Sequence, residues 1–156
     1  MAIDPKLIQS YTQAAGQMRA AVAGLSRAEL NAHPVAGTWS IQQIVVHIVD
    51  SDLILADRMK RVIAEDNPTL IGFDESKFVA ELHYELWPVD EAITIFDLNR
   101  KNFAKVLAVL PPATWGRKGT HNEAGVLSLL DLMQRAVNHV EHHLKFARQK
   151  RQLLGK

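Results

Sequence analysis

The chain has 156 residues, of which 47% are apolar, so it suits one folded domain over residues 1–156 and is not intrinsically disordered. Its 18 Lys and Arg nearly balance 17 Asp and Glu, which excludes the basic footprint of a nucleic-acid-binding protein. It contains no cysteine, so disulfides and thiolate metal ligands are excluded, and no apolar run resembles a signal peptide or membrane span, so we expect a cytoplasmic protein without a membrane partner.

The first long helix is predicted from Asp4 and Pro5 to about Gly24. An N-cap followed by proline at the first helical position is a typical start, and apolar residues then recur every 3.6 positions. Ser26 and Glu29 form a capping box, which predicts a short helical turn directly afterwards.

A loop over residues 31–37 leads to the second long helix, which Ser40 and Gln43 begin as a capping box. This helix must end before Pro68, because the residue before a proline is disfavoured in the helical conformation. Residues 66–73 are therefore predicted as a loop.

A short helix follows from Asp74 to about Tyr84, and the Trp87–Pro88 pair breaks it. The third long helix is predicted from Glu91 to about Leu110, with Asp90 as its N-cap. Two consecutive prolines then end it.

Residues 114–125 are predicted as a loop. Ser128, with Asp131 as its capping-box partner, begins the fourth long helix, which extends to about Leu154. Four amphipathic helices with unequal connections predict an all-α four-helix bundle with an extra short helix in one connection.

Three histidines are the main candidates for a functional site. His139 and His143 lie four residues apart, so a helix places them on one face, and His47 lies on the apolar side of another helix. Three imidazoles and an open position are typical of a catalytic metal site. The alternative is that they are core histidines with satisfied hydrogen bonds, although burying three imidazoles without partners is costly.

Several other classes of site lack their motifs. The sequence has no HExxH of a metalloprotease, no Glu-x-x-His pair of a di-iron bundle on the histidine helices, no glycine-rich phosphate loop and no nucleophile elbow.

The chain resembles the DinB/YfiT superfamily, and in particular its YfiT-like branch. The resemblance spans about residues 34–149 and rests on four stretches: GTWSIQQIVVHIVDSD, RVIAEDNPTLIGFDE, THNEAGVLSL and NHVEHHLKFA. It implies that His47, His139 and His143 bind one divalent ion, commonly zinc or nickel, which water or substrate completes. It also implies adjacent histidine-bearing helices and a homodimer. Phe73, Phe78 and Trp87 offer a candidate patch for the dimer, or could equally cover the end of the bundle.

Two positions depart from the pattern of the branch. Val46 replaces the first of two adjacent histidines, and Asp52 replaces a further histidine. Neither change removes an expected ligand, but both alter the surroundings of the site.

Other polar residues are weaker candidates. His142 and His121 could border the site or be ordinary polar residues, and Asp50 could orient an imidazole or face solvent. Trp39 is expected to pack beside the Ser40 cap. The remaining candidates are expected at the surface: His33, His83, Arg58, Lys60 and Arg61. Arg58 could alternatively reach an anionic substrate.

The resemblance favours a metal-dependent low-molecular-weight-thiol S-transferase, whose partners are a small thiol and an electrophile. Because the chain has no cysteine, any thiol must come from a substrate. The runner-up is a metal-dependent hydrolase that uses metal-bound water. The sequence shows no general base beside the three histidines, which leaves a non-enzymatic metal-binding or stress-response protein as a further alternative.

Overall fold

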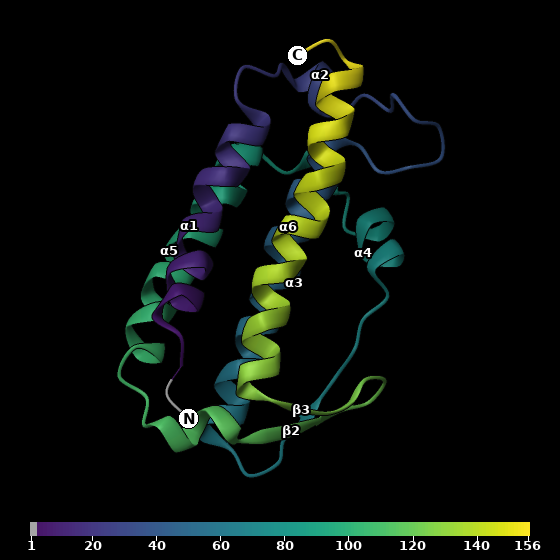
Figure 1. Ribbon diagram of the computed structural model, residues 1–156. Helices are drawn as coiled ribbons and strands as arrows, with labels where there is room; N and C mark the ends of the chain where they lie inside the picture. The colour runs from purple at the N-terminus through teal and green to yellow at the C-terminus, as the bar shows by residue number, and fades with distance from the viewer. Residues whose placement is uncertain (1–2) are drawn as a thin grey trace.

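The computed structural model describes residues 3–156, and four long helices form its bundle (Figure 1). The six helices are α1 (Pro5–Val22), α2 (Arg27–Leu30), α3 (Ile41–Ala64), α4 (Glu75–Glu81), α5 (Val89–Leu107) and α6 (Leu129–Leu153). Two 3-10 turns cover Tyr84–Leu86 and Pro112–Gly116. The predicted all-α four-helix bundle, with extra short helices in its connections, is confirmed.

Each long helix packs against two of the others. α3 contacts α6 and α5, and α1 contacts α5 and α6, so α1 and α3 lie on opposite corners of the bundle. The two histidine-bearing helices, α3 and α6, are therefore neighbours, as the resemblance implied. In Figure 1 they run side by side along most of the bundle.

Helix starts follow the capping signals closely. Asp4 accepts a hydrogen bond from the backbone of Lys6, and Ser26, Ser40 and Ser128 each form a complete capping box. These interactions satisfy backbone N–H groups that the first turn leaves free.

The predicted start of α5 was wrong by two residues. The helix begins at Val89 with Pro88 as its N-cap residue, so Asp90 lies in the first turn instead of capping it. There its negative charge still complements the helix dipole. The helix ends at Leu107, three residues before the predicted Leu110. The short helix α4 ends at Glu81, also earlier than expected.

A small sheet replaces the two predicted loops at residues 66–73 and 114–125. Strand β1 (Thr69–Leu70) pairs in parallel with β2 (Lys118–His121), and β2 pairs antiparallel with β3 (Gly125–Ser128). Gly125 has a φ of 72°, a left-handed conformation that glycine tolerates in a hairpin turn. The sheet fixes the chain immediately before α6 (Figure 1).

The core contains an unpredicted buried ion pair between α5 and α3. Arg100 and Asp52 are each only 1% exposed, and Arg100 Nη2 donates to Asp52 Oδ1 over 2.7 Å. The guanidinium carbon lies 4.1 Å from the Tyr11 ring centre and 4.2 Å from that of Phe96. Asp52 therefore joins α3 to α5 in the core.

The aromatic residues expected to form a dimer patch are partly buried within the chain. Phe78 and Trp87 pack against the hydrophobic core, and Phe73 contacts Phe78 with ring centres 4.7 Å apart. They cover the bundle, so they do not supply an exposed patch. Self-association stays a prediction, and light scattering at high protein concentration tests it.

None of the helices described between residues 3 and 156 combines the length and hydrophobicity that a membrane span requires.

Candidate metal centre

The structure brings the three predicted histidines together at the contact between α3 and α6. His47 is fully buried, whereas His139 and His143 are half-buried and lie one turn apart. The ring centre of His47 lies 5.0 Å from that of His139 and 4.6 Å from that of His143. The ring centres of His139 and His143 are 4.5 Å apart. We call these three residues the histidine triad.

The nitrogen atoms of the triad fit a shared divalent ion. Each residue offers one ring nitrogen, and the three atoms lie within 4.8 Å of one another. His47 Nε2 and His139 Nε2 are 3.1 Å apart. Two nitrogens bound tetrahedrally to zinc at about 2.1 Å would be roughly 3.4 Å apart. The observed spacing is therefore close to that of two ligands of one ion, and the assignment as ligands stays a prediction.

Two neighbours hold the buried imidazole of His47. Its Nδ1 atom lies 3.3 Å from Ser51 Oγ, one helical turn further along α3. The Trp39 ring centre lies 4.9 Å from that of His47, and Trp39 stacks on His143 at 6.1 Å. Ser51 can accept a hydrogen bond from Nδ1–H, which directs Nε2 toward the other two histidines.

The surroundings keep the triad uncharged. Burial, reinforced by the charge of His143, lowers the pKa of His47 to about 3. Burial and the neighbouring cationic groups lower the pKa of His139 to about 3 and that of His143 to about 4. Only neutral imidazole binds a metal, so all three rings are in the binding form at neutral pH.

Glu75 supplies an acidic group that sequence reasoning missed. It is the first residue of α4, and its Oε2 atom lies 3.9 Å from His47 Nε2. Burial raises the pKa of Glu75, while the charge of His142 opposes this shift. No motif links Glu75 to the histidines, because only folding of the α3–α4 connection brings the carboxylate to them. The expectation that the triad lacks a nearby base was therefore wrong.

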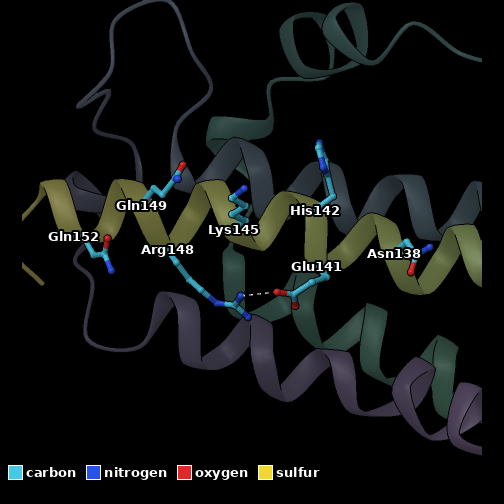
Figure 2. A pocket seen from close by; sticks show the side chains of 7 residues that line it. All are labelled: Asn138, Glu141, His142, Lys145, Arg148, Gln149 and Gln152. Carbon is cyan, nitrogen blue, oxygen red and sulfur yellow. Dashed lines mark hydrogen bonds and ion pairs between the residues drawn. The ribbon is translucent and has the colours of Figure 1, made fainter.

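His142 is exposed and does not join the triad. Its ring packs edge-on against His143, with centres 5.1 Å apart. Figure 2 shows its side chain pointing away from Glu141 and Arg148, which form a 2.9 Å ion pair in a hollow on the outer face of α6. His142 was expected either to border the site or to be an ordinary polar residue. Its exposure agrees with the second expectation, although its ring also borders the site.

Three other expectations need correction or refinement. Asp50 accepts a hydrogen bond from the Tyr84 hydroxyl, so it binds a connection rather than orienting an imidazole. Arg58 is only 9% exposed, so it does not belong to a solvated face. His121 is also 9% exposed, whereas His33 and His83 are exposed as expected.

Two cavities reach the triad from different sides. The first, which we call the arginine cavity, has a volume of about 440 Å³ and includes Arg58, Phe73, Glu75, His121, Arg135 and His139 in its wall. The second, which we call the tryptophan cavity, has a volume of about 810 Å³ and includes Trp39, Ile44, His143, Phe146, Lys150 and Leu153. His139 thus borders one cavity and His143 the other.

Comparison with known proteins identifies the family. The family model of the DinB superfamily matches residues 10–147. The chain belongs to the DinB superfamily. A Bacillus mycoides protein named "Putative metal-dependent hydrolase" is 30% identical over 138 residues, covering 88% of this chain and 79% of that protein. An Oceanobacillus iheyensis protein of the same name is 27% identical, with 79% and 71% covered.

Solved structures share the fold at low sequence identity. YfiT from Bacillus subtilis, described as "a probable metal-dependent hydrolase with an unusual four-helix bundle topology", gives a TM-score of 0.91 at 19% identity, covering 99% of this chain and 91% of YfiT. The mycothiol-dependent maleylpyruvate isomerase gives a TM-score of 0.68 at 10% identity, covering 90% of this chain and 58% of the isomerase chain. The YfiT-like fold implied by the sequence resemblance is thereby confirmed.

Proposed function

We propose that the protein is a divalent-metal-dependent S-transferase for a low-molecular-weight thiol, with His47, His139 and His143 as its metal ligands. Imidazole nitrogen suits zinc and nickel, which are the ions we propose. The convergence of three neutral imidazoles, one buried and two half-buried, supports this assignment.

The observation that carries the transferase proposal is the pair of cavities that meet at the triad. Group transfer brings two substrates to one centre, whereas hydrolysis needs one substrate and water. The arginine cavity borders His139 and the tryptophan cavity borders His143, so each substrate has a separate approach. The chain has no cysteine, so the reacting sulfur must belong to a substrate. The DinB fold is also that of a mycothiol-dependent isomerase, which is consistent with thiol chemistry.

In the proposed reaction the thiol loses its proton and its sulfur forms a bond to an electrophilic carbon, whose leaving group departs with the electron pair of the broken bond. When bound, a divalent cation supplies the positive charge that favours the thiolate at neutral pH.

The chain's own residues position and deprotonate the substrates. Glu75 Oε2 is the proposed proton acceptor, because it lies 3.9 Å from His47 Nε2 and its pKa is raised by burial. Ser51 Oγ holds His47 through Nδ1, and the Trp39 ring packs against the rings of His47 and His143.

A metal-dependent hydrolase is the second candidate. Glu75 could equally take a proton from water, and the relatives from Bacillus mycoides and Oceanobacillus iheyensis carry that name. A metal-binding protein without catalysis would need neither Glu75 nor two substrate cavities.

A thiol titration of the Co²⁺-loaded protein tests the proposal. We expect a sulfur-to-metal charge-transfer band with small thiols at neutral pH, below the ordinary thiol pKa near 8.5, and thioether product on adding an electrophile. Glu75→Gln should keep the band but slow product formation by about 10²–10⁴-fold. Glu81→Gln, at the other end of α4, is the matched control.

The outcomes separate the three functions. Absence of the band with a panel of cellular thiols would contradict the transferase proposal. Ester or amide cleavage under the same conditions would then favour hydrolysis. Thiol binding without product from any electrophile would favour a non-enzymatic protein.

A further inference from the structure

Arg58 is a buried cation in the wall of the arginine cavity. Its side chain is only 9% exposed, and Nη2 donates a hydrogen bond to the Ile71 carbonyl. The Nε atom is buried and has no hydrogen-bond partner among the described residues. A buried guanidinium nitrogen without an acceptor is costly unless a ligand supplies one.

Two further cationic or cation-forming groups face the same cavity. Arg135 comes from α6 and His121 from the end of β2. Within residues 3–156, neither Arg58 nor Arg135 has a carboxylate within 4.0 Å. Burial and then the charge of Arg58 lower the pKa of His121; Glu123 opposes this shift, and Arg135 adds to it. The groups therefore repel one another in the absence of a ligand.

The acidic residues near this cluster do not neutralise it. The charge of Glu123 raises the pKa of Arg58, but the two side chains are too far apart for an ion pair. The Glu123 carboxylate lies instead near Gly72, in the connection between α3 and α4. Glu75 lines the cavity, but its Oε2 atom lies beside His47. Glu123 and Asp57 therefore offset the charge of Arg58 only from a distance, and neither forms an ion pair with it.

The fold holds this arrangement in place. The β2–β3 hairpin carries His121, and the Gly72 N–H donates to Asn122 Oδ1 over 2.7 Å at the hairpin turn. Arg58 is fixed from α3 by its bond to the carbonyl of Ile71 in the same connection. The cavity is therefore built before any ligand arrives, which reduces the entropic cost of binding.

We propose that Arg58 and Arg135 bind a carboxylate group of the thiol substrate in the arginine cavity, beside the histidine triad. This inference rests on the proposed thiol transferase function. Guanidinium groups bind carboxylates through paired, charge-assisted hydrogen bonds, and both arginines reach one cavity. His139 belongs to the same wall, so a thiol anchored by its carboxylate can present its sulfur to the triad.

The tryptophan cavity is the complementary site for the electrophile. Its wall is largely apolar, through Trp39, Ile44, Phe146 and Leu153. An apolar electrophile fits there, which leaves the cationic cavity to the charged thiol.

Matched thiols test the inference in the Co²⁺-loaded protein. The probes are 3-mercaptopropionate and its neutral counterpart 3-mercaptopropanol, and the readout is the dissociation constant from the charge-transfer band. We expect the carboxylate thiol to bind about tenfold or more tightly, as a charge-assisted bond allows. Arg58→Met and Arg135→Gln should each abolish most of this preference. Arg61→Gln should retain it, because Arg61 is exposed on the same helix and pairs with Asp57.

Arg135→Gln keeps the test valid if Arg58→Met fails to fold, since Arg135 is exposed. Equal dissociation constants for the two thiols would overturn the carboxylate site while leaving the transferase proposal intact. If neither thiol gives a band, the transferase proposal fails. Calorimetric titration of the metal-free protein with malonate then tests whether Arg58 and Arg135 bind a carboxylate. Malonate binding that Arg135→Gln abolishes would support it, and no binding would overturn it.

Discussion

The bundle core contains two buried polar clusters that differ in how their hydrogen-bonding groups are used. In the Arg100–Asp52 pair, all three guanidinium nitrogens donate: Nε and Nη2 to Asp52, Nη1 to the Tyr11 carbonyl, and Nη2 also to the Ala136 carbonyl. In the histidine triad, among residues 3–156, the facing Nε2 atoms of His47 and His139 have only each other within hydrogen-bonding distance, with Glu75 further away.

The difference separates a polar cluster that holds helices together from one whose nitrogens could bind an ion. Arg100 joins α5 to α1, α3 and α6, so its bonds are used in holding the bundle together. The triad nitrogens lie within 4.8 Å of one another, an arrangement that one ion could share. Separate substitutions can disrupt the ion pair and the histidine triad independently.

The largest effect is expected when the ion pair loses one partner. Asp52→Ala leaves the Arg100 charge buried and should lower the free energy of unfolding by about 3–5 kcal/mol. Chemical denaturation measures the change. Asp57→Ala removes the exposed Arg61 partner from the same helix and should cost less than about 1 kcal/mol. Equal losses in the two variants would contradict the structural role of Asp52.

Removing a triad histidine should instead abolish stabilisation by metal. His143→Ala should change the unfolding free energy of the metal-free protein by less than about 1 kcal/mol, because no hydrogen bond of that ring holds the fold. Free metal at 100 times its dissociation constant should stabilise the original protein by about 2.7 kcal/mol. That gain should vanish in His143→Ala and persist in His33→Ala, whose ring is exposed.

A smaller effect is expected from the residue that supports His47. Ser51→Ala removes the hydroxyl 3.3 Å from Nδ1, so the imidazole is less firmly oriented. Metal affinity should fall by about 10–100-fold, as for other residues that orient a ligand. Competition with a chromophoric chelator measures it. An unchanged affinity would show that packing alone, including Trp39, orients the ring.

Acid should destabilise the metal-free protein through the triad. The pKa values of His47 and His139 are lowered to about 3 and that of His143 to about 4, so the folded protein does not take up these protons near pH 5. The unfolded chain does so below its ordinary pKa of about 6.5. Stability should thus be constant above that pH and fall as the pH drops toward 4, by about 1.4 kcal/mol per pH unit for each imidazole. A triple His→Ala variant should lack this contribution to the slope.

The sequence predicted the four long helices because local signals specify them. Capping residues such as Ser40 and Ser128 mark helix starts, and the apolar period marks the buried face. The i,i+4 spacing of His139 and His143 placed them together for the same reason.

The sequence could not reveal features that depend on distant contacts. β1 pairs with β2 across about fifty residues, and neither strand has a strong alternating pattern. Glu75 reaches His47 only after the α3–α4 connection folds back. Arg100 lies on the apolar stripe of α5, where a charged residue is explained only once Asp52 is seen opposite.

A Co²⁺ titration followed by visible absorption tests the central claim most directly. We expect one equivalent of Co²⁺ to bind per chain with the strong visible bands of a low-coordinate site. These bands should be lost when His47, His139 and His143 are together replaced by Ala. Unchanged stoichiometry and spectrum in the triple variant would contradict the assignment of the triad as the metal site.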